Sequence, residues 1–257
     1  MMPPAYVLAR MTWPEVKAAL ETVRLAIIPT GSCEQHGPNM TLETDAAICY
    51  AIGERLAERL YPRALLAPVL PLGVSPHHMS FPGTITLRPE TYDAVLYDTV
   101  ASLKRHGINH FLLVNGHGGN MASLDVASLK MRQELNVNIA FMFYMQLAAD
   151  VIRSGAKTTL YGHACEVEAS VGLYIAPHTV KAERVVGQVH PYAHAHTDIK
   201  AAARMGYPFL FEEFTGNGAL GDARLATVEF GQQIVETAIE RTLEFLQTFM
   251  PSDEETL

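Results

Sequence analysis

Short apolar runs that alternate with helical patterns determine the fold class that this chain can adopt. The runs occupy residues 25–28, 65–70, 111–114 and 137–145. Short continuous apolar runs are typical of parallel strands that are covered on both faces. Because helical patterns separate them, we predict a single three-layer α/β/α domain with a mainly parallel sheet over residues 1–257. The acidic tail, residues 250–257, is expected to be flexible.

Composition limits the partners and the location of this protein. A net charge of -8 argues against nucleic acid or an anionic membrane surface as the main partner. The three cysteines have unrelated spacings, which indicates neither a disulfide framework nor a thiolate metal site. No apolar run reaches the length of a membrane span, and the N-terminus lacks the pattern of a signal peptide. We therefore expect a cytoplasmic protein.

A loop rich in glycine and proline follows the first apolar run and carries three candidate metal ligands. Glu34 and His36 are two residues apart, so in an extended segment their side chains point to the same side. Asp45 follows Thr44, a good helix cap, and the helix dipole favours a carboxylate in the first helical turn. Such residues can also serve only to fix a loop or cap a helix. Two carboxylates and an imidazole at a strand end nevertheless fit a metal site.

A second loop of the same kind follows the apolar run at residues 111–114. It has the sequence Asn-Gly-His-Gly-Gly-Asn and carries a single histidine, His117. A lone histidine in a loop is most often structural. Because the carboxyl ends of parallel strands meet at one edge of a sheet, we nevertheless expect His117 to lie close to the first loop.

A third motif contains one histidine and two glutamates. His163 and Glu166 are three residues apart, so on a helix they would share a face. Glu168 would point elsewhere unless the segment is extended. Cys165 lies in the same motif and could act as a thiol nucleophile, although a small, semi-buried cysteine is the more usual role.

These motifs together can hold two divalent ions. In this hypothesis Glu34, Asp45 and His117 bind one ion. His36 binds the other, together with Asp45 as a bridge and one glutamate of the third motif. The charges of two ions, three carboxylates and a bridging hydroxide cancel, and such a site lowers the pKa of a shared water. Nitrogen and oxygen ligands without thiolate suit Zn(II), Mn(II) or Fe(II).

Other catalytic designs have weaker support in the sequence. There is no Gly-x-Ser-x-Gly motif, so Ser32 fits a turn residue better than a nucleophile. The glycines of residues 116–119 lack the lysine and the spacing of a phosphate-binding loop. The histidine-rich segment at residues 190–196 fits a surface loop better than a metal cluster.

Several motifs resemble those of the creatininase (creatinine amidohydrolase) family. They are Gly-Ser-x-Glu-Gln-His-Gly (31–37), Thr-Asp (44–45), Phe-Pro-Gly-Thr (81–84), Asn-Gly-His-Gly-Gly-Asn (115–120), His-Ala-x-x-x-Glu (163–168) and Gly-Asp (221–222). The match spans roughly residues 8 to 245. The resemblance implies a single α/β domain, two adjacent divalent metal ions, hydrolysis of a non-peptide C–N bond and usually a homohexamer.

The resemblance also implies roles for individual residues. By position, Glu34, Asp45 and His117 match the ligands of one metal ion. His36 and Asp45 match ligands of the other ion. His163 matches a histidine proposed to move protons during ring opening.

The chain differs from creatininase itself in the Asn-Gly-His-Gly-Gly-Asn motif at residues 115–120. Gly118 and Gly119 stand where that enzyme has an aromatic residue and a metal-binding glutamate. It also lacks the tryptophans that creatininase uses around its substrate, so creatinine is not the expected substrate. Glu168 is our first candidate for the missing ligand and Glu166 the second. With Glu168 as the ligand, we predict His163 and Glu166 as the catalytic residues.

The predicted function is therefore a dinuclear metal-dependent amidohydrolase of a small molecule. It would cleave a cyclic amide or a formamide by means of a metal-bridging hydroxide. The Gly-Gly form resembles the wider family, which includes deformylases and enzymes that trim peptide-derived cofactors. A metal-dependent lactone or C–C hydrolase, or an isomerase, on the same fold is the alternative.

Overall fold

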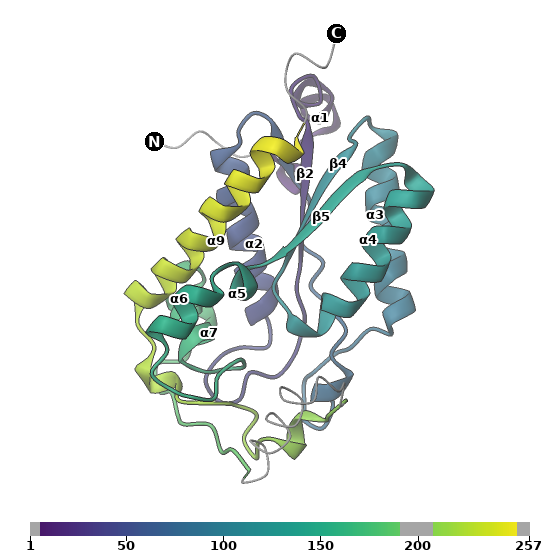
Figure 1. Ribbon diagram of the computed structural model, residues 1–257. Helices are drawn as coiled ribbons and strands as arrows, with labels where there is room; N and C mark the ends of the chain where they lie inside the picture. The colour runs from purple at the N-terminus through teal and green to yellow at the C-terminus, as the bar shows by residue number, and fades with distance from the viewer. Residues whose placement is uncertain (1–5, 191–207, 251–257) are drawn as a thin grey trace.

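A five-stranded parallel sheet forms the centre of the molecule, as the computed structural model shows for residues 6–190 and 208–250. The strands are β1 (Tyr6–Val7), β2 (Leu25–Thr30), β3 (Ala64–Leu66), β4 (His110–Asn115) and β5 (Asn138–Phe143). They lie in the order β1-β3-β2-β4-β5, and all neighbours pair in parallel (Figure 1). The predicted α/β fold is confirmed. The predicted flexible tail lies almost wholly outside the described residues.

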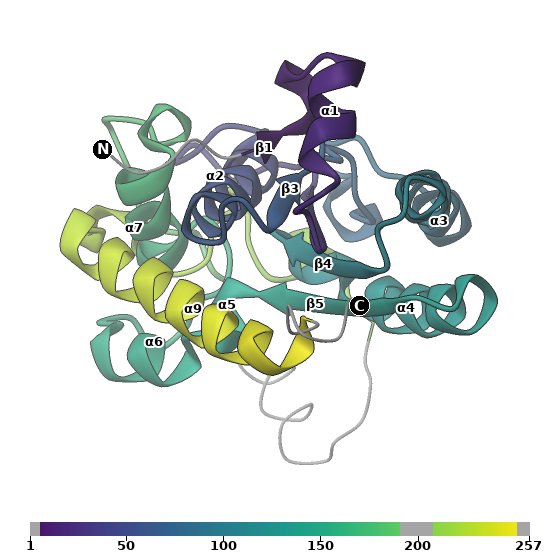
Figure 2. The ribbon, with the colours of Figure 1, turned by 90° about the horizontal axis from the view of Figure 1, so that it is seen from above.

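Helices cover both faces of this sheet. They are α1 (Trp13–Ala19), α2 (Thr44–Arg59), α3 (Pro89–Arg105), α4 (Met121–Leu135), α5 (Tyr144–Leu147), α6 (Ala149–Gly155), α7 (Glu166–Ile175) and α9 (Val228–Phe249). Helices α2, α7 and α9 lie on one side of the sheet, and α3 and α4 lie on the other (Figure 1 and Figure 2). Within the described ranges, no helix is long and apolar enough to cross a membrane.

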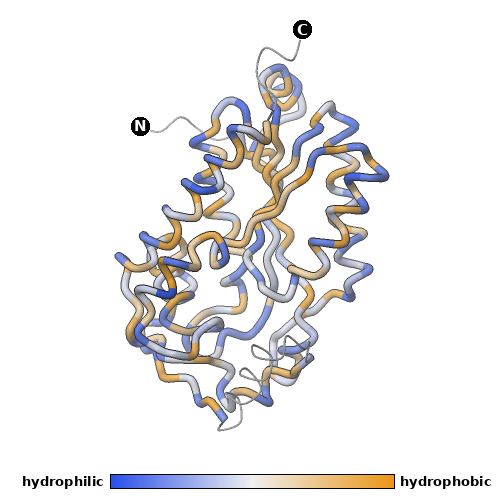
Figure 3. Tube along the Cα trace, viewed as in Figure 1, coloured by the Kyte–Doolittle hydropathy of each residue, from blue (hydrophilic) through white to orange (hydrophobic). Residues whose placement is uncertain are grey.

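Alternating side chains along the strands supply two hydrophobic cores. Leu25 and Ile27 of β2 belong to the core on the α2 and α9 side, whereas Ala26 and Ile28 belong to the core on the α3 and α4 side. All six residues of β2 are buried, as its continuous apolar run predicts. Figure 3 shows hydrophobic residues along the central strands and hydrophilic residues mainly on the outer surfaces of the helices.

The order of the strands reverses between β2 and β4, and this reversal positions the site. From β2 the chain passes through α2 to β3 on one side, whereas β4 pairs with β2 on the other side. Loops that leave two such strands diverge, and a crevice forms outside the carboxyl ends of the strands. In Figure 1 these loops lie below the sheet. The loops that carry Glu34 and His117 follow these two strands.

Two strands end earlier than their apolar runs predict. β3 ends at Leu66, close to Pro68, which has no N–H group for a strand ladder. β5 ends at Phe143, and α5 begins at Tyr144. In both places the first residue after the strand, Ala67 or Tyr144, is still buried, and the rest of the apolar run is only partly buried or exposed.

Candidate metal centre

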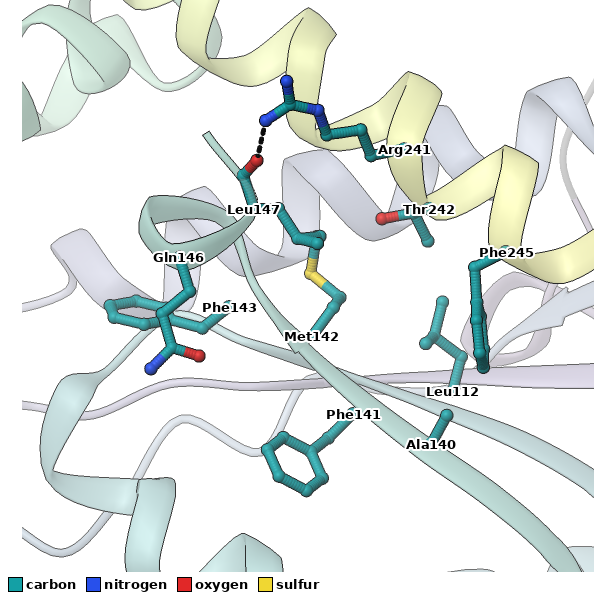
Figure 4. Close-up of a pocket in the computed structure, with 10 residues that line it drawn as sticks. All are labelled: Leu112, Ala140, Phe141, Met142, Phe143, Gln146, Leu147, Arg241, Thr242 and Phe245. Carbon is teal, nitrogen blue, oxygen red and sulfur yellow. Dashed lines mark hydrogen bonds between the residues drawn. The ribbon is translucent and has the colours of Figure 1, made fainter. Parts of the chain in front are cut away.

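A cavity of about 180 Å³ lies at the carboxyl ends of β2 and β4. Its wall combines carboxylates and imidazoles with aromatic side chains from more distant segments. A larger pocket of about 280 Å³ lies between β5 and α9, and its lining is mainly apolar (Figure 4). Arg241, which lines that pocket, donates hydrogen bonds to the Leu147 backbone oxygen and to Asp150. The smaller cavity is the candidate site because it brings several titratable groups together.

Three residues from separate elements converge on one side of this cavity. Glu34 lies in the loop after β2, Asp45 in the first turn of α2, and His117 directly after β4. His117 Nδ1 lies 3.1 Å from Glu34 Oε2 and 3.3 Å from Asp45 Oδ2. All three side chains are buried, and they can offer their ligand atoms to one ion. The structure thus brings together the three residues predicted for the first ion.

Hydrogen bonds behind these residues fix which atoms face the cluster. His117 Nε2 lies 3.2 Å from the Val74 backbone oxygen, which can only accept, so this nitrogen carries a hydrogen. Nδ1 is therefore the nitrogen available to a cation. The Ser75 hydroxyl donates to Glu34 Oε2 at 2.6 Å. Such outer partners hold ligand side chains in orientation.

A second group of possible ligands lies beside the first. His36 Nε2 is 3.2 Å from Asp45 Oδ1 and 3.9 Å from Glu168 Oε2. His163 Nδ1 is also 3.9 Å from Glu168 Oε2, so these two histidines and the glutamate can converge on one ion. Asp45 directs one oxygen to His117 and the other to His36. This arrangement suits a bridging carboxylate.

The residues present fit divalent ions, and two buried atoms support this. His36 Nε2 and Asp45 Oδ2 are buried and form no hydrogen bond of good geometry, although each has an ionisable neighbour at 3.2 or 3.3 Å. A buried polar atom without a partner costs about 1–3 kcal/mol, so native proteins rarely leave one unsatisfied. Metal coordination would satisfy both atoms. Imidazole and carboxylate ligands without thiolate suit zinc, manganese or iron.

The charges of the cluster also favour a cation. Burial opposes a charge on His36, but the Asp45 carboxylate raises the pKa of His36 to about 10. Burial raises the pKa of Glu168 to about 7, against the lowering effect of protonated His36. Protons therefore occupy the positions that a divalent ion would take, and metal binding has to release them.

Gly119 cannot carry a side chain in this backbone. A Cβ atom there would lie 2.3 Å from His117 Nε2, 2.5 Å from the Val74 backbone oxygen and 2.8 Å from His77 Cε1. The short contact with the Val74 backbone oxygen would force the loop to move. Glu168, our first candidate for the missing ligand, instead reaches the cluster from the first turn of α7.

Glu166 lies away from the cluster. Its Oε1 atom accepts hydrogen bonds from the backbone N–H groups of Lys157 and Thr158, each at 2.7 Å, and from the Thr158 hydroxyl at 2.8 Å. His163 and Glu166 do not share a helix face, because α7 begins only at Glu166. The geometry gives Glu166 a role in holding the preceding loop rather than in catalysis.

His78 and Phe211 are site residues that have no counterpart in our sequence predictions. His78 is buried, and its Nε2 atom lies 3.5 Å from Glu34 Oε1. The long loop rich in glycine and proline at residues 71–84 indicated a functional segment, but nothing there distinguished this histidine. Phe211 packs on His78 and His163, with ring centroids 4.2 and 4.7 Å away. Its position far along the chain gave no signal.

Comparison with known proteins gives a family match over most of the chain. Residues 9–246 match the model of the family described as Creatininase: Creatinine amidohydrolase. The chain belongs to the creatininase family. The resemblance predicted from the motifs is confirmed, and the similarity extends over nearly all of the chain.

Three proteins illustrate the similarity to this creatininase-family chain. The mycofactocin precursor peptide peptidase of Mycobacterium ulcerans (strain Agy99) is 29% identical over 248 residues, which cover 93% of this chain and 87% of that protein. The creatinine amidohydrolase of Pseudomonas putida is 27% identical over 260 residues, which cover 94% and 96%. A solved structure described as Creatininase Mn has a TM-score of 0.76 and 25% identity, and covers 96% of this chain and 100% of that chain.

Proposed function

We propose that this protein is a dinuclear metal-dependent amidohydrolase that cleaves a non-peptide C–N bond, in a cyclic amide or a formamide, of a small molecule. Asp45 carries the proposal, because its two oxygens face two separate groups of ligands. Glu34 and His117 would complete one ion site. His36 and Glu168 would complete the other. A solved structure of this fold is described as Creatininase Mn, and this description supports a metal in the site.

His163 is the proposed acid and base of the reaction. When bound, two divalent ions would lower the pKa of a shared water and polarise a carbonyl oxygen. His163 donates its Nε2 hydrogen to the Gln35 backbone oxygen at 2.7 Å, so its Nδ1 atom faces the cluster. Burial lowers the pKa of His163, and the neighbouring histidines lower it further. The neutral ring can therefore take a proton from water and return it to the leaving nitrogen.

The shape of the cavity supports a small substrate. Phe143, Met145, Phe209 and Phe211 form an apolar part of its wall. An apolar wall excludes water, and the exclusion of water strengthens electrostatic interactions at the reacting carbonyl. The volume of about 180 Å³ fits a small ring or a short acyl group better than an extended peptide. The relatives named peptidases nevertheless make a short peptide the second candidate substrate.

A substrate screen on metal-replete protein tests this function. Lactams, formamides, lactones and short peptides are incubated with the protein, and the products are identified by mass. We expect turnover of a lactam or a formamide, abolished by a chelator and restored by Zn(II) or Mn(II). Turnover of peptides or lactones alone would assign a different reaction to the site, and failure to bind any metal would refute the proposal.

We also propose that the protein acts in the cytoplasm as a homo-oligomer. The proposal rests on the creatininase resemblance, which implies a hexamer. Light scattering on the purified chain at micromolar concentration measures the assembled mass. A fully active monomer would contradict this part of the proposal.

A further inference from the structure

The side chain of Gln35 lies buried between two histidines of the site. Its Nε2 atom lies 2.9 Å from His78 Nδ1, 3.0 Å from His163 Nε2 and 3.1 Å from the Gly218 backbone oxygen. Its Oε1 atom accepts from the Gly37 N–H group at 2.8 Å. A backbone N–H can only donate, so this contact fixes which end of the amide faces the histidines.

The hydrogen bonds around Gln35 allow one consistent arrangement of hydrogens. His163 Nε2 uses its hydrogen to reach the Gln35 backbone oxygen, so it cannot accept one from the amide. The two amide hydrogens of Gln35 therefore go to His78 Nδ1 and to the Gly218 oxygen. A neutral histidine whose Nδ1 accepts carries its own hydrogen on Nε2. In His78 that atom faces Glu34 Oε1 at 3.5 Å.

We propose that Gln35 is a positioning residue, whose side-chain amide holds His78 in the Nε2–H tautomer directed at Glu34. The proposal rests on the proposed function, because Glu34 is there a metal ligand. His78 and His163, with ring centroids 4.6 Å apart, then present opposite hydrogen-bonding groups to the cluster. His78 offers a donor, and His163 offers the bare Nδ1 atom that accepts a proton.

The turn at Gly218 supports the position of this amide. Gly218 has a φ of +80°, which favours glycine, and a Cβ atom there would lie 2.0 Å from Gln35 Oε1. The turn therefore closes directly on the Gln35 side chain. A segment distant in sequence thus holds Gln35, Gln35 holds His78, and His78 faces Glu34. Loss of an outer partner of a metal ligand typically costs about 10- to 100-fold in metal affinity or activity.

Gln35→Glu tests the proposal because it replaces the donor with an acceptor of the same size. His78 then has to carry its hydrogen on Nδ1, which leaves Nε2 bare opposite Glu34. Long-range ¹H–¹⁵N spectra of the zinc-loaded protein distinguish the two tautomers, and the His78 signals are identified by their absence in His78→Asn. We expect the Nε2–H form in the wild type and the Nδ1–H form in Gln35→Glu. Both zinc ions should remain, and kcat should fall about 10- to 100-fold with little change in KM.

Gln35→Met keeps the length of the side chain and removes the donor without adding a charge. We expect both tautomers of His78 to be populated in this variant, with a similar loss of kcat. Gln133→Glu, on an exposed part of α4, is the matched control and should change neither the spectra nor kcat. Circular dichroism would check that each variant folds.

Two outcomes separate this proposal from the function on which it rests. If His78 keeps the Nε2–H form in both Gln35 variants, or if kcat stays within about twofold of the wild type, Gln35 does not position it. If instead the wild-type protein binds no metal and hydrolyses no amide, the proposed function fails. The tautomer of His78 is then measured by the same kind of spectra on the metal-free protein, so the two results remain distinct.

Discussion

Substitution of Glu168 by glutamine tests the second metal site most directly. The variant keeps the size of the side chain and removes the negative charge that faces His36 at 3.9 Å. The second ion would then keep two strong ligands, His36 and Asp45, fewer than the three protein ligands that catalytic zinc sites generally use. We expect one bound ion per chain instead of two. Because loss of an outer partner already costs about 10- to 100-fold, loss of a ligand should lower kcat by more than about 100-fold.

Glu166→Gln is the matched control, because it makes the same chemical change two residues earlier on the same helix. Glu166 accepts three hydrogen bonds from Lys157 and Thr158. The glutamine oxygen still accepts, so the variant loses the charge-assisted part of these bonds, about 1–2 kcal/mol. For a chain of this size the Tm should fall by about 2–8 °C. Both metal ions and kcat should stay at the wild-type level.

Elemental mass spectrometry of dialysed protein counts the ions, and thermal melts report the stability. Two ions retained in Glu168→Gln would refute the assignment of Glu168 as a ligand. Loss of one ion in Glu166→Gln would transfer the ligand role to Glu166 and contradict its placement in the structure. If neither variant loses an ion, the second site is built from other residues.

Further predictions concern the bridge, the glycine loop and pH. Asp45→Asn should weaken both ions together; one ion held at wild-type affinity in a metal titration would show that Asp45 does not bridge. Gly119→Ala places a Cβ 2.3 Å from His117 Nε2, so we expect a lower Tm and loss of the first ion; unchanged metal content would contradict this packing argument. Metal affinity should rise with pH around pH 7, because Glu168 and His36, with pKa values of about 7 and about 10, hold protons in the metal-free protein and release them on binding. Calorimetry in buffers of different ionisation enthalpy counts these protons, and a count of zero would refute the prediction.

The parts of the site that follow the central strands could be predicted from the sequence. Glu34 and Asp45 come after an apolar run that ends in glycine and proline, and His117 comes after a second such run. The register of parallel strands then forces the loops after neighbouring strands to one edge of the sheet. The local sequence alone therefore predicts that these residues lie close together. No long-range contact has to be known for this prediction.

The remaining residues depend on features that no local pattern contains. Successive residues on a helix turn by about 100°, so Glu166 and Glu168 face nearly opposite directions. A shift of α7 by two residues would exchange their roles, and the sequence does not define its start so closely. His78 ends a short 3-10 helix (Pro76–His78) within a long loop, where contacts such as the bond from the Ser75 N–H to Thr86 set its position. Phe211 reaches the site only through the tertiary fold.

Gly119 and Glu168 belong to one arrangement of the second metal site. By resemblance, creatininase supplies a carboxylate from the position of Gly119, where this backbone has no room for a side chain. In our proposal Glu168 supplies the same charge from α7, so the charge balance of two ions is unchanged. A Cβ atom added to the neighbouring Gly118 would have no atom within 4 Å. This position therefore leaves open space where, by resemblance, creatininase carries an aromatic residue. In this proposal the ligands keep the same total charge while the wall beside them differs, which is the physical reason to expect a substrate other than creatinine.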